Sequence, residues 1–539
     1  MKDISSTGSF VDFTLENFIY VDKTVYIPQL VKLKRVFISR PRRFGKSLTL
    51  DTIATLFETG VEPYFKGTWI YDKWTEPTYP VLRLNFLNFD KNTLEKFNNK
   101  LNSKITEFAE LNQVTTYKEK EEAEDSIDHL LEQLRLEGRQ IVILIDEYDC
   151  QMTANINNET LYKQFQEKIK SFYANIKNKW PIKFLGITGV TRLKDIEIFS
   201  IGSDIRDITN ASAYSQMIGF TRDEIKRYYI DYLKLAASYE NKCRVEEVTD
   251  TQIESMLDMM AQNYDGYCFD EFYKKKVFST WSVNSFFQSI IENKFVDFGE
   301  YWYDNGGLPS ILVNYLKTHK LNSLDYVEKD KTITIRVNDF KNPTSLTSIN
   351  QNVLMCQTGY LTLRSPVYSK GFMTLGIPSS EVYNALLSLM ALNIFDDTKL
   401  ENVNEQILSQ SKDVGEIIEL FNTVLNTVSY DNYPISSEAV VQQLLYMYLK
   451  GICNSVSAEL HSSKGRADLV IESDNRRIVF EFKYAKNEIE AKVKLSEAIE
   501  QIKTRDYGNI VPKKAELLRI AAVFNADPKV RAFTEYHEV

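Results

Sequence analysis

Four short apolar runs in the first third of the chain are separated by longer amphipathic stretches, and this rhythm restricts the fold more than any other feature of the sequence. The runs cover residues 36–39, 80–86, 141–145 and 182–187. Short runs of this kind are typical of buried parallel strands, and the stretches between them have helical periodicity. The sequence therefore predicts an N-terminal α/β domain built on a parallel sheet.

A phosphate-binding loop is predicted directly after the first run, where Gly45-Lys46-Ser47 opens an apolar helix. Backbone N–H groups of such a loop and of the helix start point partial positive charge at phosphate oxygens. Lys46 is expected to bridge the β- and γ-phosphates of ATP, and Ser47 to ligate Mg²⁺. The usual pattern begins with glycine, but this chain has Arg40 there, so Pro41 is expected to hold the shape of the loop.

Two further groups of polar residues follow the later runs. Asp146 and Glu147 end the third run, in the arrangement in which the aspartate orders Mg²⁺ and the glutamate polarises the attacking water. Thr188 ends the fourth run, where it can contact the γ-phosphate or the lytic water, and Arg192 can sense charge. An ordinary strand-end turn explains Thr188 and Arg192 equally well. Together with Lys46, these residues predict nucleotide binding and hydrolysis.

The pattern changes at Thr221 to helices rich in aromatic residues, with strand-like pieces at 332–337 and 361–363 and a helical stretch over 380–429. The last part of the chain predicts a helix (437–450), two strands joined by a tight turn (467–484), a helix (491–504) and a strand (518–524). We therefore predict three regions: a P-loop domain over 1–217, a mostly helical middle region over 218–430, and a second α/β domain over 431–539.

The two C-terminal strands bring three charged residues together. If Asp474-Asn475 form a two-residue turn, residue 472 pairs with 477, and Asp468 faces Glu481. Because side chains alternate along a strand, Lys483 shares a face with Glu481. Two carboxylates that close would repel without a hard cation such as Mg²⁺ or Mn²⁺ between them. A solvated hairpin face with alternating charges is the alternative explanation.

This D-x(n)-E-x-K pattern is the signature of metal-dependent phosphodiester hydrolysis, in which the lysine positions the attacking water or offsets charge on the scissile phosphate. Glu438, on the preceding helix, is expected to add a ligand, with Glu459 as the alternative. Gln501 and Tyr507, on or just after the following helix, are placed to contact the same face.

Composition removes several other classes of protein. The five cysteines contain no C-x-x-C pair and the four histidines lie far apart, which disfavours a disulfide framework, zinc sites and histidine-based catalysis. No run approaches eighteen apolar residues and the start lacks a signal peptide, so we expect a cytoplasmic protein without a membrane partner. The net charge of -9 disfavours nucleic acid at first sight, but residues 431–539 hold 16 basic and 16 acidic residues. Residues 32–46, which include Arg42 and Arg43, hold seven cationic residues and no acid.

Several segments resemble the bacterial AAA-ATPase-like family, and the C-terminal motifs resemble the PD-(D/E)XK nuclease domain often fused to it. The segments are YVDKT (20–24), SRPRRFGKSL (39–48), LIDEYD (144–149), TGVTR (188–192), YDGYCF (264–269) and LMCQTGYLTL (354–363). In that family RPRRFGKS commonly replaces the loop with the first glycine, so the resemblance implies that Arg40 is a family feature. It also implies a C-terminal restriction-endonuclease-like α/β fold.

The resemblance implies an ATP-gated, Mg²⁺-dependent nuclease acting on nucleic acid, with DNA as the expected substrate. The sequence leaves two other functions open: a nucleotide-switched scaffold whose nuclease-like domain only binds, and a bare ATPase with a structural tail. It also leaves open assembly into a homo-oligomer, for which no arginine acting in trans can be named.

Overall fold

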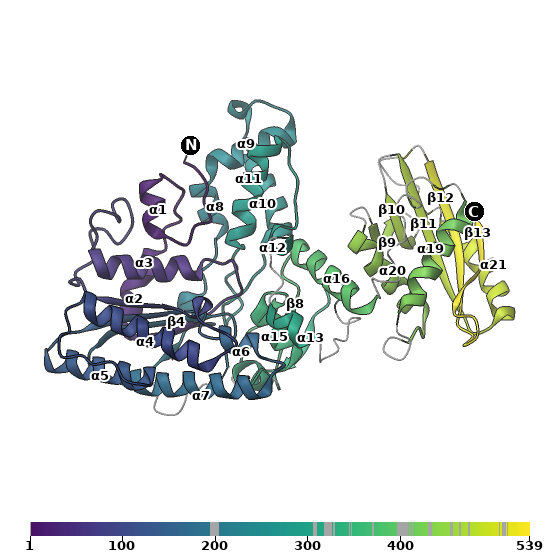
Figure 1. Ribbon diagram of the computed structural model, residues 1–539. Coiled ribbons are helices and arrows are strands. Elements are labelled where there is room, and N and C mark those ends of the chain that lie inside the picture. Colours follow the sequence, from purple (N-terminus) through teal and green to yellow (C-terminus); the bar gives the residue numbers. More distant parts are fainter. Residues whose placement is uncertain are drawn as a thin grey trace. The chain divides into compact units, whose positions relative to one another are not determined.

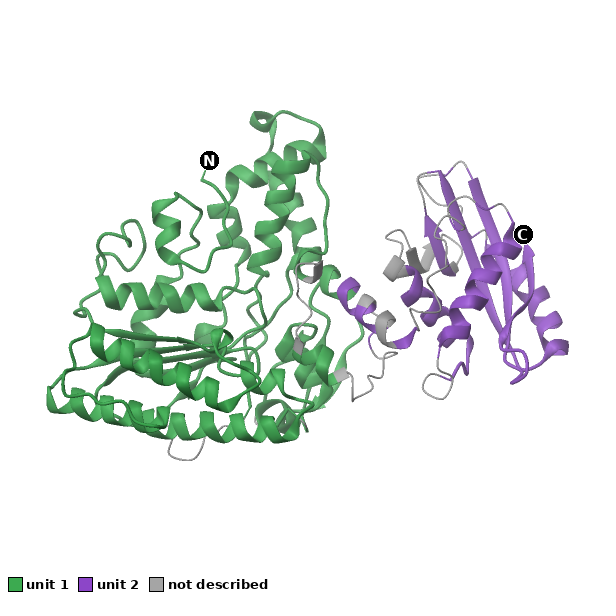
Figure 2. Cartoon of the chain, in the orientation of Figure 1, with its two compact units in different colours: residues 1–321, 329–383 green, residues 322–328, 384–539 purple. Residues whose placement is uncertain are grey.

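A computed structural model shows two compact units (Figure 1 and Figure 2). Unit 1 comprises residues 1–321 and 329–383, and unit 2 comprises residues 322–328 and 384–539. The structure describes residues 2–193, 204–304, 310–316, 326, 329–343, 345–346, 348–368, 371–395, 408, 411, 413–428, 434–452, 456–462, 465–472, 475–505, 507–508, 514 and 516–539.

Unit 1 is built on a five-stranded parallel sheet with the strand order β2-β3-β4-β1-β5. The strands are β1 (Arg35–Ser39), β2 (Val81–Asn85), β3 (Ile141–Asp146), β4 (Ile182–Gly189) and β5 (Arg206–Asp207). Every residue of β1 and β3 is buried, as expected for strands covered on both faces. The predicted parallel sheet is confirmed, and β5 is a short edge strand without a sequence signal of its own.

Helices cover both faces of this sheet (Figure 1). Helix α3 (Lys46–Thr59) lies on one face, and α4 (Leu94–Leu111), α5 (Ala123–Leu136) and α7 (Glu159–Ile176) lie together on the other. Shorter helices are α1 (Phe10–Leu15), α2 (Ile27–Leu33) and α6 (Cys150–Ala154). Because all strands are parallel, the residues that follow β1, β3 and β4 lie at one edge of the sheet, which is where such folds bind ligands.

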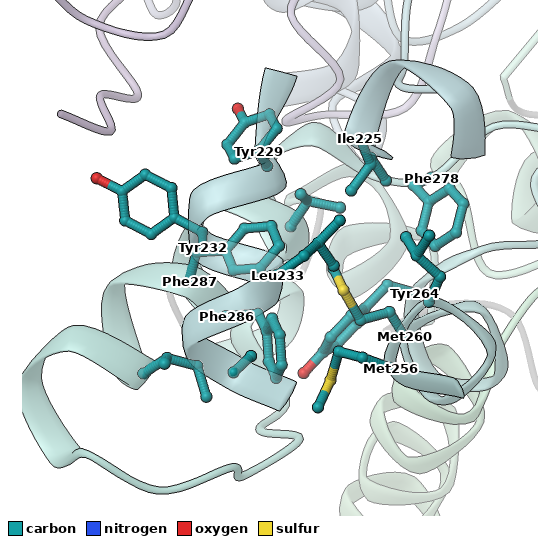
Figure 3. Packing of buried hydrophobic residues seen from close by; sticks show 14 of the residues in the cluster. Ile225, Tyr229, Tyr232, Leu233, Met256, Met260, Tyr264, Phe278, Phe286 and Phe287 are labelled. Atoms are coloured by element: carbon teal, nitrogen blue, oxygen red, sulfur yellow. The ribbon is translucent and has the colours of Figure 1, made fainter. Parts of the chain in front are cut away.

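The middle of the chain is mainly helical, as predicted, and its core is an aromatic cluster (Figure 3). Its helices include α8 (Arg222–Tyr228), α9 (Ile230–Asn241), α10 (Asp250–Tyr264), α11 (Thr280–Asn293), α12 (Tyr301–Asp304), α13 (Ser310–Leu316), α14 (Val337–Lys341), α15 (Gln351–Thr358) and α16 (Ser380–Ile394). Tyr229 and Phe287 stack with ring centroids 5.3 Å apart inside that cluster. A small antiparallel sheet, β6 (Ile333–Arg336), β8 (Phe372–Gly376) and β7 (Thr362–Leu363), interrupts the helices, and β8 was not predicted.

Unit 2 contains a second five-stranded sheet with the order β13-β12-β11-β10-β9. The strands are β9 (Val456–Ser462), β10 (Gly465–Glu472), β11 (Arg476–Ala485), β12 (Glu516–Asn525) and β13 (Ala532–Glu538), and β11 and β12 are parallel. Among its described residues, unit 2 has the helices α19 (Val414–Thr427), α20 (Glu438–Ile452) and α21 (Glu488–Arg505), besides the part of α16 from residue 384 onward. Phe421 of α19 packs against Phe480 on one face of the sheet, and Ile502 of α21 packs against Val479 on the other. The central hairpin and α21 confirm the prediction, whereas β9 and β13 were missed.

Candidate functional site

The loop after β1 has the conformation of a phosphate loop although Arg40 replaces its first glycine. Gly45 has a φ of 98° and Arg43 a φ of 67°, both in the left-handed region, so the chain turns sharply before α3 begins at Lys46. The Lys46 ammonium is buried and donates hydrogen bonds to the carbonyl oxygens of Arg40 and Pro41, both at 3.1 Å. The Lys46 side chain therefore joins the end of the loop to the two carbonyl groups at its start.

Three of the predicted side chains meet at Asp146, the last residue of β3. One carboxylate oxygen, Oδ2, accepts a hydrogen bond from Ser47 Oγ at 2.6 Å, and the other, Oδ1, accepts one from Thr188 Oγ1 at 2.5 Å. Ser47 comes from the start of α3 and Thr188 from β4. A hydroxyl beside a buried carboxylate is the oxygen pair that holds Mg²⁺ in phosphate-loop enzymes, so these residues fit that ion.

Glu147 faces a small cavity next to this cluster. The cavity is also lined by Arg42, Lys91 and Asp149. Burial raises the pKa of Glu147, and Lys46, whose Nζ lies 4.0 Å from Glu147 Oε1, opposes that shift. A carboxylate with a raised pKa beside cationic side chains is suited to polarising a water molecule.

Arg40 and Arg43 are engaged by other parts of unit 1. The buried Arg40 guanidinium donates to the carbonyls of Ser39 at 2.9 Å and Thr209 at 2.7 Å, and its Cζ lies 4.1 Å from the ring centre of Phe269. Burial lowers the pKa of Arg40 to about 9. Arg43 stacks on Trp281, with its Cζ 4.0 Å from the ring centre. Arg40 therefore links the loop to the segment at Thr209, and Arg43 links it to α11.

Further contacts tie the same loop to the helical part of unit 1. Thr280 Oγ1 donates to the Arg43 carbonyl at 2.9 Å, and Trp302 Nε1 donates to the Arg42 carbonyl at 3.4 Å. Arg192, the predicted charge sensor, forms an ion pair with Asp207 of β5 at 2.5 Å. The phosphate loop is thus held in shape by side chains that come from far along the sequence.

A largely apolar pocket of about 150 Å³ adjoins the phosphate loop. Gly45, Leu48 and Thr49 form the side of the pocket nearest the loop. Tyr20, Lys23 and Trp281 are among the residues that line the rest of it. Apolar walls with a few polar groups are typical of sites for small organic ligands.

In unit 2 the hairpin has the register that the sequence predicted. Glu472 pairs with Arg477 and Leu469 with Phe480, which places Asp468 opposite Glu481. Asp468 Oδ2 accepts a hydrogen bond from the Phe482 backbone N–H at 2.8 Å. The two carboxylates consequently share the face of the sheet that α21 covers. Residues 473 and 474 of the expected turn lie outside the described residues.

Glu481 is the most unusual group in unit 2. Its side chain is only 1% exposed, one carboxylate oxygen accepts from Lys483 Nζ at 2.7 Å, and the other, Oε2, is buried without a hydrogen-bond partner. Burial and the nearby charge of Asp468 raise the pKa of Glu481 to about 7. A buried carboxylate oxygen without a partner is costly, so the residue is suited to a cation that would satisfy it.

The Lys483 ammonium lies among oxygen atoms that a metal ion would also attract. Besides Glu481, it contacts the Phe482 carbonyl at 3.0 Å and Glu438 Oε1 at 3.3 Å. In the described part of the chain no three Asp, Glu, His or Cys side chains are grouped closely enough to hold a metal ion by themselves. Mg²⁺ commonly uses one or two carboxylates and fills its other positions with water and phosphate oxygens, so Asp468 and Glu481 fit it.

Two family models match separate parts of the chain. Residues 5–199 match the family model described as "Predicted AAA-ATPase", and residues 436–533 match that of the PD-(D/E)XK nuclease superfamily. The chain joins a predicted AAA-ATPase domain to a PD-(D/E)XK nuclease superfamily domain.

Two individual proteins are similar to it. An uncharacterized protein in the vnfD 5′ region of Azotobacter chroococcum mcd 1 is 25% identical over 533 residues, covering 95% of this chain and 94% of the relative. The crystal structure of Cdc6p from Pyrobaculum aerophilum aligns over 68% of this chain and 91% of its own, with 11% identity and a TM-score of 0.21. A TM-score this low indicates only a weak overall similarity.

The PD-(D/E)XK domain contains functional candidates that sequence reasoning did not find. Gln442 of α20 donates to the Asp468 carbonyl at 2.6 Å, and Arg505, at the end of α21, donates to the Tyr507 hydroxyl at 3.0 Å. Gln501 also donates to that hydroxyl, at 3.1 Å. The side chain of Glu459, the alternative ligand to Glu438, lies outside the described residues.

The AAA-ATPase-like domain also contains a residue, Asp149, whose role the sequence did not indicate. Asp149 accepts hydrogen bonds from the Thr191 backbone N–H at 2.7 Å and the Thr191 hydroxyl at 2.5 Å, which fixes the turn after β4.

No helix among the described residues is long and apolar enough to cross a membrane. The division at residues 217 and 430 and the assembly of several copies stay predictions.

Proposed function

We propose that this protein is a Mg²⁺-dependent nuclease whose cleavage of nucleic-acid phosphodiester bonds is controlled by ATP. The observation that carries the proposal is Glu481: its Oε2 atom is buried without a partner, beside Asp468 and Lys483 on one face of a PD-(D/E)XK hairpin. A buried carboxylate oxygen that the protein alone leaves unsatisfied, beside a second carboxylate, favours a site completed by a divalent cation.

At the nuclease site, Asp468 and Glu481 would hold Mg²⁺, and Glu438 would add an outer contact. A bound Mg²⁺ supplies Lewis-acid polarisation of the phosphate and makes a coordinated water more acidic. Lys483 keeps its proton, since its hydrogen bond and charge interactions with Glu481 help to raise its pKa against the opposing effect of burial. Its ammonium can therefore orient the attacking water and offset negative charge that develops on the phosphate.

At the nucleotide site, Gly45 and Lys46 would bind the phosphates of ATP, and Ser47 and Asp146 its Mg²⁺. Glu147 would polarise the water for hydrolysis, with Arg42 in the same cavity. Thr188, which is bonded to Asp146, would position that water, and Arg192 would respond to the γ-phosphate through its ion pair with Asp207. The apolar pocket beside Gly45 is the natural place for the nucleoside.

The loop contacts support control of the nuclease by ATP. Arg43 is held by Thr280 and Trp281, and the Arg42 carbonyl accepts a hydrogen bond from Trp302. A ligand that shifts this loop must therefore change contacts made by the helical part of unit 1. Such contacts give a physical route by which bound ATP alters the helical part of unit 1.

The test is a cleavage assay with purified protein and labelled single- and double-stranded DNA and RNA, with Mg²⁺ or Mn²⁺, with and without ATP. Asp468→Ala and Glu481→Ala should each reduce cleavage by about 10³-fold or more, because each removes a metal ligand. The matched control is Glu497→Ala, which removes an exposed glutamate of α21 whose ion pair with Lys494 lies on the surface.

Lys46→Ala tests the control by ATP separately. It should abolish ATP binding and make cleavage independent of ATP. Cleavage that still responds to ATP in this variant contradicts the proposed control. Absence of cleavage by the wild-type protein with every substrate and metal contradicts the nuclease and favours a nucleotide-switched binding protein.

A further inference from the structure

The end of α21 carries a cluster of three polar side chains, Gln501, Arg505 and Tyr507, on the face of the sheet that holds Glu481. The Tyr507 side chain is fully buried and packs with Val479 and Ile502 in the core between α21 and the sheet. Val479 is two residues before Glu481 on β11 and so projects from the same face. Tyr507 is therefore a fixed point close to the carboxylates.

The hydrogen bonds of Tyr507 leave a donor available. Its hydroxyl oxygen accepts from Gln501 Nε2 at 3.1 Å and from Arg505 Nη1 at 3.0 Å, which occupies both of its lone pairs. Among the described residues nothing accepts the hydrogen of that hydroxyl. Because Tyr507 is buried and the Gln501 amide also carries an acceptor oxygen, the donors that the cluster exposes are those of the Arg505 guanidinium, which is suited to an anion.

Arg505 is held by Tyr507 but is not neutralised. The guanidinium is exposed, and no carboxylate among the described residues lies within ion-pair distance of it. The hydrogen bond to Tyr507, with smaller contributions from the charges of Glu481 and Asp468, raises the pKa of Arg505. Its remaining N–H groups therefore face solvent near the two carboxylates.

We propose that Arg505, oriented by Tyr507, binds a phosphate oxygen of the nucleic-acid strand adjacent to the scissile phosphodiester. The strand would then be held at two points, by Arg505 and by the cation bound to Asp468 and Glu481. This inference rests on the proposed nuclease function and adds to it a residue for substrate binding. An arginine fork matches the geometry of a phosphate better than lysine does.

The experiment uses the full-length protein with Arg505→Gln, Arg505→Lys and the control Lys503→Gln. Lys503 lies in the same last turn of α21 and is exposed, so its replacement removes the same charge. Binding of a labelled oligonucleotide is measured with Ca²⁺ in place of Mg²⁺ at several salt concentrations, and steady-state cleavage is measured with Mg²⁺. Thermal melting checks that each variant is folded.

Arg505→Gln should raise Kd and KM about tenfold, with a smaller change in kcat, and should reduce the salt dependence of binding by about one ion. Arg505→Lys should recover part of the affinity, and Lys503→Gln should resemble the wild type. If Arg505→Gln binds and cleaves like Lys503→Gln while the wild-type protein cleaves, the role of Arg505 is refuted and the nuclease function stands. If the wild-type protein neither binds nor cleaves nucleic acid, the proposed function itself fails.

Discussion

The two candidate sites use similar chemistry but differ in how well the protein alone satisfies their buried carboxylates. In the AAA-ATPase-like domain, both oxygens of Asp146 accept hydrogen bonds from hydroxyls, and the Lys46 ammonium donates to loop carbonyls. In the PD-(D/E)XK domain, one oxygen of the buried Glu481 has no partner. When a ligand binds, Asp146 and Lys46 therefore exchange one hydrogen-bond partner for another. Glu481 instead gains a partner for an oxygen atom that had none.

This difference has consequences for how each site responds to its metal. Leaving a buried polar group unsatisfied costs about 1–3 kcal/mol, and a ligand that binds only the folded state recovers stability by mass action. The nuclease site should therefore be sensitive to metal and pH even without substrate. The nucleotide site should be preformed and depend mainly on the residues that contact ATP and on those that hold its loop.

Among the variants that compare the two sites, Asp146→Asn should give the largest effect. Because the variant removes the charge expected to hold Mg²⁺, it should weaken Mg²⁺-ATP binding by about 100-fold and leave ATP binding without Mg²⁺ nearly unchanged. Equilibrium binding of a fluorescent ATP analogue with and without Mg²⁺ measures both values. Asp468→Asn is the matched control in the other domain and should bind Mg²⁺-ATP normally. An Asp146→Asn protein whose ATP affinity still rises with Mg²⁺ would remove Asp146 from the metal site.

Glu481→Gln should stabilise the metal-free protein at pH 8. The pKa of Glu481 in the folded state is about 7, above its ordinary value of 4.5, so the stabilisation by the bound proton is complete below 4.5 and is lost as pH rises through 7. Glutamine resembles the protonated acid, and the gain at pH 8 should be about 1–3 kcal/mol. Denaturant unfolding of unit 2 in EDTA at pH 8 and pH 4.5 measures it.

The gain should shrink toward pH 4.5, and Glu497→Gln, at an exposed position, should show none at either pH. Equal stability of Glu481→Gln and the wild type at pH 8 would contradict a strained, metal-free carboxylate. Glu481 would then be as well satisfied without metal as Asp146 is.

Local sequence signals predicted the features that depend on neighbouring residues. The strands β1 and β3 contain continuous apolar runs, β4 is apolar over most of its length, and the register that sets Asp468 opposite Glu481 follows from the position of the turn. The strands β9 and β13 were missed because they are polar and lie at the two edges of their sheet, so neither has a continuous apolar run.

The supports of each site depend on contacts between distant segments, which spacing does not reveal. Arg40 looked like a defect in the phosphate loop, but its partners Thr209 and Phe269 lie far along the chain. At the nuclease site, Gln442 of α20 donates a hydrogen bond to the Asp468 carbonyl, although the two residues are 26 positions apart in the sequence. In both cases the charged residue is held in its site by residues that only tertiary packing brings close.

The affinity of the nuclease site for Mg²⁺ should rise with pH, because the metal competes with the proton on Glu481. With a pKa of about 7, the fraction of ionised Glu481 increases about tenfold between pH 6 and pH 8, and the affinity should follow it. Isothermal titration with Mn²⁺ in the Asp146→Asn variant isolates this site from the nucleotide site. Affinity that is constant over this range would show that Glu481 is not a ligand or is already ionised at pH 6.

Thr280→Val should have the smallest effect, and it tests whether the helical part of unit 1 holds the phosphate loop. The change keeps the shape of the side chain but removes the hydrogen bond from Thr280 Oγ1 to the Arg43 carbonyl, which is worth about 0.5–1.5 kcal/mol. ATP affinity should fall about three- to tenfold, since the loop must be ordered on binding, while Mn²⁺ affinity at the nuclease site stays constant. Thr59→Val, at the exposed end of α3 away from the loop, is the control. If Thr280→Val binds ATP like Thr59→Val, the loop keeps its shape without this contact, and the preformed character of the nucleotide site must come from Arg40 and Lys46 within the loop itself.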